Sequence, residues 1–165
     1  PTRRSSDLVI DSSSLNIHQL EKKVNDYFNQ SSDVDLKVNI LSFGYKYGIP
    51  VDADLVMDCR FIANPHWDPK LRPLTGLDKS VSKAVLESAN VEEFLERYQS
   101  LFDTLAKGFI AEGRKFITLA IGCTGGKHRS VAITEELVTR LANGINLSNY
   151  RIQTHGIHRD LGREI

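Results

Sequence analysis

Hydrophobic residues recur every three or four positions in several parts of the chain, which is the spacing of an amphipathic helix. The first run comprises Ile17, Leu20, Val24 and Phe28. Gln19 stands three residues after Asn16, as in a capping box, so a helix is predicted to begin at Asn16. Two further helices are predicted, one over residues 80–88 and one that starts near Val131 and ends at Asn143-Gly144.

The longest apolar stripe predicts a helix that begins after Asn90, with Glu93 three residues further on as a capping partner. The stripe consists of Val91, Phe94, Leu95, Tyr98, Leu101, Phe102 and Leu105. Lys107 and Gly108 predict the end of this helix, because a cation and a glycine both suit a helix C-terminus.

Runs of apolar residues between these helices predict strands. The predicted strands are residues 38–43, 53–62 and 116–121, with a further candidate in 150–165. The run at 116–121 does not alternate with polar residues, as in a parallel strand buried on both faces. Pro65 and Pro69 predict a loop over residues 64–69. Strands that alternate with helices predict an α/β fold with an open, mainly parallel sheet and helices on both faces.

Composition then narrows the class of protein. The chain has 165 residues, of which 41% are hydrophobic and 25% charged, and these values exclude collagenous, low-complexity and largely disordered proteins. Lys plus Arg and Asp plus Glu number 21 each, so no overall charge attracts nucleic acid or anionic lipid, and any anion site must be local. Cys59 and Cys123 form no Cys-x-x-Cys pair, and no apolar run is long enough to span a bilayer. A cytoplasmic protein without a membrane partner is predicted.

The residues at the start of the chain differ in pattern from the rest, which predicts a division of the chain into two parts. Residues 7–11 are a short apolar run, preceded by residues without periodicity and by no initiator Met. We interpret residues 1–14 as the remnant of a preceding domain with its linker, and residues 15–165 as one domain.

The stretch most informative about chemistry is Gly122–Ser130 (GCTGGKHRS), which lies between a predicted buried strand and a predicted helix. Its glycines allow the backbone to turn tightly with amides facing inward, and the following helix adds unpaired N–H groups. Lys127, His128 and Arg129 add cationic donors, and residues 114–129 contain no acidic residue. A phosphate group is the predicted ligand. The stretch does not match the Walker pattern, which makes nucleotide binding by this part of the chain a weak hypothesis.

The same stretch matches the phosphatase spacing of Cys, five residues, Arg and Ser or Thr, through Cys123, Arg129 and Ser130. In that chemistry a thiolate attacks phosphorus, the arginine holds two phosphate oxygens, and the hydroxyl helps the thiolate to leave. Asp68, in the sequence Trp-Asp-Pro, is the candidate general acid. A Cys-dependent phosphatase with catalytic Cys123, Arg129 and Asp68 is therefore the alternative to a binding site, and the plainest interpretation is a small buried cysteine.

Five ordered segments combine unusual residues. They are Phe43–Pro50 (FGYKYGIP), Asp58–Phe61 (DCRF), Asn64–Pro69 (NPHWDP), Leu71–Asp78 (LRPLTGLD) and Gly122–Val131 (GCTGGKHRSV). Together they resemble the C-terminal domain of the RapZ/YvcJ family of RNase adaptors and P-loop nucleotide-binding proteins. The resemblance spans about residue 7 to the end of the chain, and residues 7–11 resemble the end of an N-terminal P-loop domain.

The resemblance implies a fold like a subdomain of phosphofructokinase and a two-domain cytoplasmic bacterial protein. ATP or GTP would be bound, and hydrolysed, by the N-terminal domain, with no cofactor, no metal and no catalysis in this one. In enterobacterial members the C-terminal domain senses glucosamine-6-phosphate, and the protein binds small RNAs and presents one of them to an RNase. Partners implied are a sugar phosphate, small RNA, an RNase or two-component protein, and further copies in a homodimer or homotetramer.

The resemblance also implies a pocket made by the glycine-rich stretch with His66 and Asp58. With the anion chemistry of the stretch, the candidate ligand-binding residues are Asp58, His66, Cys123, Thr124, Gly125, Gly126, Lys127, His128, Arg129 and Ser130. Arg129 and the loop amides would hold the phosphate. Asp58 would hold a sugar hydroxyl or a protonated amine, and His66 would donate to the sugar phosphate.

The C-terminal residues depart from the enterobacterial pattern, whose members end in a strongly basic tail that contacts RNA. Here residues 150–165 hold three arginines and two acidic residues, which is a weak driver of binding to a phosphate backbone. His155 and His158 are interpreted as solvated tail residues and not as metal ligands, because no Cys or third His lies nearby in the sequence.

Overall fold

The computed structural model describes residues 12–13, 15–17, 19–20, 34–143 and 150–163. The chain divides into two compact units, Pro1–Asp33 and Val34–Ile165. In the first unit, the Asn16 N–H donates to Gln19 Oε1 (3.0 Å) and the Gln19 N–H donates to Asn16 Oδ1 (2.9 Å). These reciprocal bonds confirm the capping box. The end of the predicted helix lies outside the described residues.

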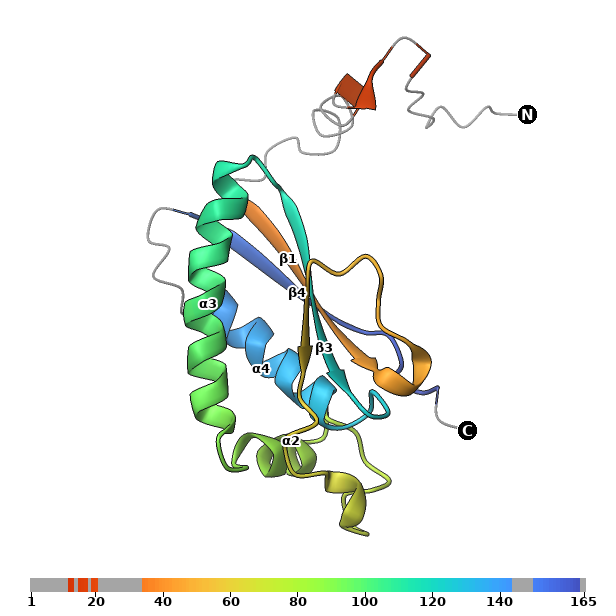
Figure 1. Cartoon of the computed structure of the whole chain (residues 1–165). Helices are drawn as coiled ribbons and strands as arrows, with labels where there is room; N and C mark the ends of the chain where they lie inside the picture. The colour runs from red at the N-terminus through yellow and green to blue at the C-terminus, as the bar shows by residue number, and fades with distance from the viewer. Residues whose placement is uncertain (1–11, 14, 18, 21–33, 144–149, 164–165) are drawn as a thin grey trace, which may run out of the picture. The chain divides into compact units, whose positions relative to one another are not determined.

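In the described part of the second unit, four parallel strands form one sheet in the order β2-β3-β1-β4 (Figure 1). The strands are β1 (Leu36–Gly44), β2 (Leu55–Asp58), β3 (Phe116–Cys123) and β4 (Ile152–His158). The central pair, β1 and β3, runs in register from Lys37 beside Phe116 to Gly44 beside Cys123. The α/β class and the parallel sheet are therefore confirmed, and the carboxyl ends of the two central strands lie side by side.

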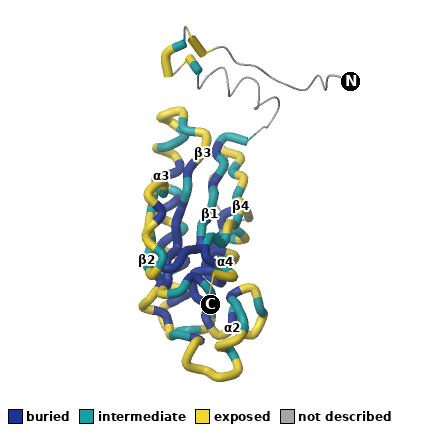
Figure 2. Tube along the Cα trace, turned by 90° about the vertical axis from the view of Figure 1, so that its right-hand side faces the viewer, coloured by how far each residue is buried: buried dark blue, intermediate teal, exposed yellow. Residues whose placement is uncertain are grey.

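The helices are α2 (Lys79–Leu86), α3 (Val91–Ala111) and α4 (Arg129–Asn143). α3 and α4 lie next to each other, because Arg140 of α4 donates to both carboxylate oxygens of Glu92 of α3 (2.8 and 2.7 Å). Their apolar faces join the inward side chains of the strands in one hydrophobic core, seen as the dark interior in Figure 2. The largest of its fully buried side chains include Leu36, Ile40, Leu95, Phe102, Leu119, Ile121, Ile133 and Leu137.

Helical coverage is one-sided within the described residues, whereas the sequence predicted helices on both faces of the sheet. On the second face Val56, Phe116 and Ile157 remain 40%, 49% and 39% exposed. The physical reason is the path of the chain. The connections from β2 to β3 and from β3 to β4 run the same way across the sheet, and right-handed crossovers then place α3 and α4 on the same face.

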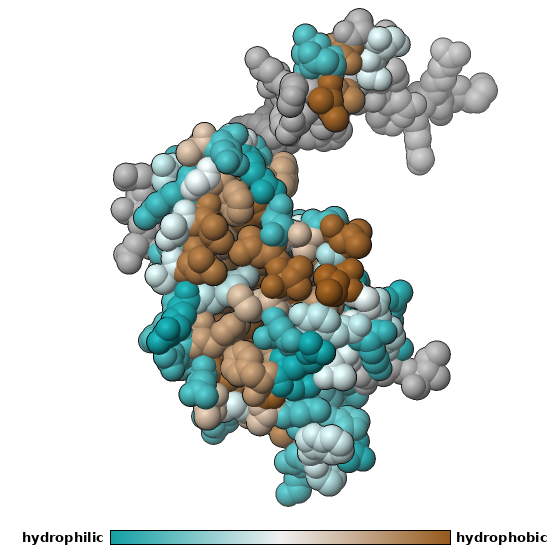
Figure 3. Space-filling model, in the orientation of Figure 1, coloured by the Kyte–Doolittle hydropathy of each residue, from teal (hydrophilic) through white to brown (hydrophobic). Residues whose placement is uncertain are grey.

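The loop before β2 exposes further apolar side chains. Ile49 and Val51 are 53% and 101% exposed. Figure 3 shows hydrophobic side chains gathered across the middle of one side of the molecule, over β2 and this loop. The connection from β1 to β2 therefore contributes surface and not core.

Several element boundaries differ from the prediction. α3 continues past Gly108 to Ala111, and Gly113, with φ of 80°, follows its end. An interior glycine costs a helix only about 1 kcal/mol, so the packing of α3 outweighs that signal. β2 ends at Asp58 and not at residue 62. The predicted loop at 64–69 contains a 3-10 turn, η2 (Pro65–Trp67), with proline at its first position, where no amide is required.

Candidate functional site

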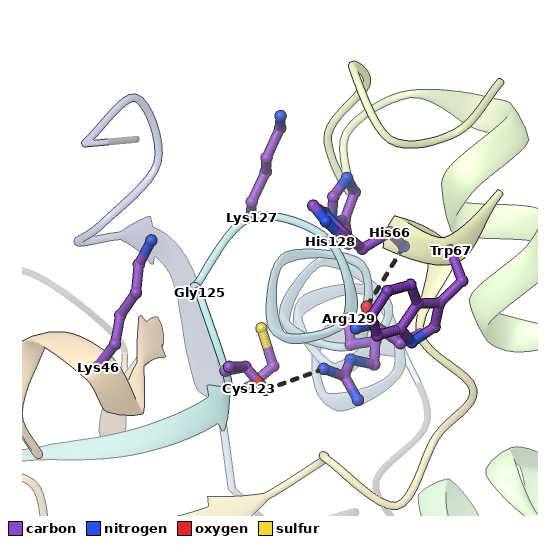
Figure 4. A pocket seen from close by; sticks show the side chains of 10 residues that line it. Lys46, His66, Trp67, Cys123, Gly125, Lys127, His128 and Arg129 are labelled. Carbon is purple, nitrogen blue, oxygen red and sulfur yellow. Dashed lines mark hydrogen bonds between the residues drawn. The ribbon is translucent and has the colours of Figure 1, made fainter. Parts of the chain in front are cut away.

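The glycine-rich stretch connects the carboxyl end of β3 to the start of α4, and we call residues 124–128 the anion loop (Figure 4). Gly126 has φ of 76°, a left-handed conformation that favours glycine. Gly44, at the end of β1, lies so close that a Cβ there would be 2.6 Å from the carbonyl carbon of Gly125. Because α4 follows directly, its N-terminal amides carry their partial positive charge to the end of the loop.

Two carbonyl groups of the anion loop accept backbone hydrogen bonds from neighbouring segments. The Lys46 N–H donates to Thr124 O (3.2 Å), and the Gly76 N–H donates to Lys127 O (2.8 Å). In a trans peptide the N–H points opposite to the C=O, so the amides of Gly125 and His128 face the other side of the loop.

Cys123, the last residue of β3, places its sulfur against the anion loop. The Gly126 N–H donates to Cys123 Sγ (3.2 Å), and Ser130 Oγ lies 3.2 Å from the same sulfur. Cys123 is 3% exposed and contributes to the lining of the pocket. Two polar groups thus meet at the Cys123 sulfur, and one of them is the hydroxyl of the Ser130 that ends the Cys, five residues, Arg, Ser spacing.

Arg129 begins α4 and is 4% exposed. Its Nη1 donates to the carbonyl oxygens of Arg60 and Ile62 (3.0 Å each), and its Nη2 donates to Thr124 Oγ1 (3.2 Å). Its Nε has no hydrogen-bond partner within the described part of the chain. A buried guanidinium with an unused donor is costly unless an anion completes its bonds.

These groups line a pocket of about 290 Å³, near the lower end of sizes for small-molecule sites. It is lined by Lys46, Asn64, His66, Trp67, Cys123, Thr124, Gly125, Lys127, His128 and Arg129 (Figure 4). The ionisable groups in this lining are ammonium, guanidinium, imidazole and thiol groups, with no carboxylate among them. A concave site of this composition attracts anions.

Most of the predicted ligand residues meet at this pocket. Those in the lining are His66, Cys123, Thr124, Gly125, Lys127, His128 and Arg129. Gly126 and Ser130 are not among the lining residues, and both contact the Cys123 sulfur instead.

The two predicted carboxylates lie outside the lining. Asp58 accepts from the Nε and Nη2 of Arg60 (2.9 and 2.6 Å to Oδ2), and these bonds lower the pKa of Asp58. Asp68 is exposed and accepts from the Lys70 N–H (2.8 Å). Asp58 therefore forms an ion pair with Arg60 outside the pocket, and Asp68 belongs to a surface turn.

Three lining residues, Lys46, Asn64 and Trp67, were not predicted. Lys46 belongs to η1 (Tyr45–Tyr47), the turn after β1, and Trp67 ends η2 and is 75% exposed. Both belong to the unusual segments FGYKYGIP and NPHWDP, which was the available signal. Nothing local to either segment indicates an anion, so only the fold reveals their role.

Asp160, in the segment after β4, bonds to Gly44, whose backbone lies against the anion loop. The Gly44 N–H donates to Asp160 Oδ2 (2.8 Å), and Asp160 is fully buried. Burial alone would raise the pKa of Asp160, but bonds from Arg159, the Gly44 N–H and Arg163 outweigh it and lower that pKa. Two of the three arginines of the C-terminal residues are thus paired with one carboxylate, at 2.8 and 2.9 Å.

His158 is not a solvated tail residue, contrary to the prediction, because residues 152–158 form β4. Its Nδ1 lies 2.8 Å from Ser42 Oγ, and its Nε2 lies 3.2 Å from Glu135 Oε1. The imidazole therefore joins β1, β4 and α4. Within the described residues, no group of three metal-ligating side chains is formed.

Comparison with known proteins gives a consistent picture. The family model described as the RapZ C-terminal domain matches residues 36–162. A nucleotide-binding protein of Streptomyces griseus is 51% identical over 162 residues, covering 98% of this chain and 47% of that protein. A nucleotide-binding protein of Thermobifida fusca is 49% identical, covering 98% of this chain and 53% of that protein. The chain thus spans about half the length of these relatives.

Proposed function

The chain belongs to the RapZ C-terminal domain family, and we propose that it is a regulatory domain that senses a phosphorylated small molecule in the pocket beside the anion loop. The observation that carries this proposal is the lining itself. It combines a helix N-terminus, a buried Arg129 with an unused Nε, and no carboxylate. A phosphate dianion would satisfy all three features.

The ligand we propose is an amino-sugar phosphate resembling glucosamine-6-phosphate. The anion loop, Arg129 and Lys127 would hold the phosphate, and the exposed indole of Trp67 would cover the apolar face of the sugar ring. Because Asp58 is engaged with Arg60 outside the lining, the amine would face the Asn64 side chain.

Calorimetric titration of the purified chain tests this proposal. Glucosamine-6-phosphate should bind saturably, inorganic phosphate should bind more weakly, and glucosamine should give no measurable heat. The reason is that the negative charge of the phosphate complements the cationic lining of the pocket. Affinity should fall as salt is raised, since the attraction is between ions. Absence of binding by every phosphorylated compound would overturn the proposal.

For the whole protein we propose post-transcriptional or metabolic control in the cytoplasm. The relatives' name, nucleotide-binding protein, supports ATP or GTP binding by the part of the relatives that this chain does not cover. Small-RNA binding as an RNase adaptor, contact with an RNase or two-component protein, and assembly as a homodimer or homotetramer are proposed with the family. None of the helices within the described residues is long and apolar enough to cross a membrane.

A second candidate function, a Cys-dependent phosphatase, is favoured by one observation, the placement of Gly126 N–H and Ser130 Oγ at the Cys123 sulfur. The sulfur would bond to phosphorus as the bond to the leaving oxygen breaks, and water would then release inorganic phosphate from the phosphocysteine. Asp68 lies outside the pocket, so an ester whose leaving oxygen needs no proton is the appropriate substrate.

Hydrolysis of p-nitrophenyl phosphate tests the second candidate. Turnover that is retained in Cys59→Ser and lost in Cys123→Ser would establish it, because Cys59 is the matched buried cysteine outside the lining. No turnover by the unmodified chain would leave Cys123 a binding residue.

A further inference from the structure

Two side chains of the anion loop, the ammonium of Lys127 and the imidazole of His128, share one neutral acceptor. Lys127 Nζ donates to the carbonyl oxygen of Arg72 (3.1 Å), and His128 Nε2 lies 3.3 Å from the same oxygen. A carbonyl only accepts hydrogen bonds, so Nε2 of His128 carries the proton. Both residues also line the pocket, which places these donors between the ligand site and the segment that contains Arg72.

That segment, residues 66–72, forms hydrogen bonds within itself and with the flanking residues Asn64, Pro65 and Leu74. The Arg72 Nε donates to His66 O (2.9 Å), and the Arg72 N–H donates to Asp68 O (2.9 Å). Its residues are exposed except for Leu71, which is partly buried against the core. Hydrogen bonds from Lys127 and His128 to the Arg72 carbonyl join this segment to the anion loop.

The segment also contributes to the pocket from the opposite side. His66 and Trp67 belong to the lining, and the imidazole rings of His66 and His128 meet in an edge-on arrangement, with centroids 6.5 Å apart and an interplanar angle of 63° (Figure 4). A ligand in the pocket is therefore in contact with the loop and with the segment that the loop restrains.

We propose that an anion in the pocket draws Lys127 and His128 away from the Arg72 carbonyl and so releases segment 66–72 from the anion loop. The inference rests on the proposed function and adds how ligand binding is transmitted. A phosphate carries full negative charge and forms hydrogen bonds about twice as strong as those of a neutral carbonyl, so it competes successfully for both donors. The Gly76 N–H to Lys127 O bond (2.8 Å) and the packing of Leu71 against the core are retained, and the former limits the release to residues before Gly76.

Release of the segment changes the surface that a partner meets. Trp67, Lys70 and Arg72 are exposed residues of this segment, and they lie beside the pocket and not within it, apart from Trp67. The occupied and empty states of the domain therefore differ in the position of an aromatic and two basic side chains. A macromolecular partner that reads the ligand state would do so here.

Two readouts follow the segment directly. Trp67 is the only tryptophan of the chain, so its emission reports on the segment alone. Trypsin can cut between Lys70 and Leu71, whereas Pro73 protects the bond after Arg72, so cleavage after Lys70 measures release. Calorimetry, Trp67 emission and the rate of cleavage after Lys70 are recorded with inorganic phosphate and with glucosamine-6-phosphate, the cleavage site being assigned by mass spectrometry.

Ligand binding should shift Trp67 emission and raise the cleavage rate after Lys70 by about five-fold or more, the effect of one lost hydrogen bond on an opening equilibrium. Lys127→Met should raise that rate without any ligand, and Lys107→Met, a lysine of α3, should leave it unchanged. Binding seen by calorimetry with unchanged emission and cleavage would overturn this inference alone. No binding would overturn the proposed function, and an unaltered ligand-free cleavage rate in Lys127→Met would overturn the restraint itself.

Discussion

Replacing Arg129 by alanine should abolish measurable binding of phosphate and of sugar phosphates, and should also lower the free energy of unfolding by about 2–4 kcal/mol. The first effect follows from loss of the only buried guanidinium at the anion loop within the described residues. The second follows because the carbonyl oxygens of Arg60 and Ile62 accept from Nη1, and each buried acceptor left without a partner costs about 1–3 kcal/mol.

Two further variants separate binding from stability. Arg129→Lys keeps the charge but loses the planar fork, so it should fold and bind phosphate at least about ten-fold more weakly. Arg140→Ala removes an arginine from the same helix, where it pairs with Glu92 and Glu136 on the surface, and should leave binding unchanged. The measurements are urea denaturation followed by circular dichroism, and calorimetry on the folded variants. Binding by Arg129→Ala at the unmodified affinity would show that the phosphate lies elsewhere.

The anion loop could be predicted from the sequence because its chemistry is local. The residues from Cys123 to Ser130 are consecutive, and a buried strand before them with a helix after them fixes where their amides point. Lys46 and Trp67 could not be assigned in this way, since they reach the pocket only through the pairing of β1 with β3 and the path of the loop after β2. Asp58 had a suitable chemistry for a ligand, but Arg60, two residues away, engages its carboxylate.

The fold shows the same division between local and long-range information. Apolar spacing was enough to predict the long helix α3 and the buried strand β3, because each carries its own pattern over many residues. The number of covered faces depends on strand order, which periodicity does not contain. His158 illustrates the limit for single residues, since its partners Ser42 and Glu135 come from β1 and α4.

Gly44→Ala should lower the free energy of unfolding by about 2 kcal/mol or more and weaken phosphate binding, because overpacking a tight site costs about 1–3 kcal/mol. The backbone at Gly44 is extended, so alanine is not strained there. Its Cβ would instead lie 2.6 and 2.8 Å from the carbonyl carbon and oxygen of Gly125, and 2.9 Å from the Gly126 nitrogen. These are backbone atoms of the anion loop, so relief of the contact must displace amides of that loop.

Gly108→Ala is the matched control for this substitution, because a Cβ at Gly108, within α3, meets nothing within 4 Å. It should stabilise the protein by about 0.5–1 kcal/mol through better helix propensity and leave binding unchanged. Denaturant unfolding and phosphate calorimetry on both variants give the comparison. If Gly44→Ala lost stability but bound phosphate normally, the loop amides would not be the phosphate ligands, and the cationic side chains alone would have to hold the anion.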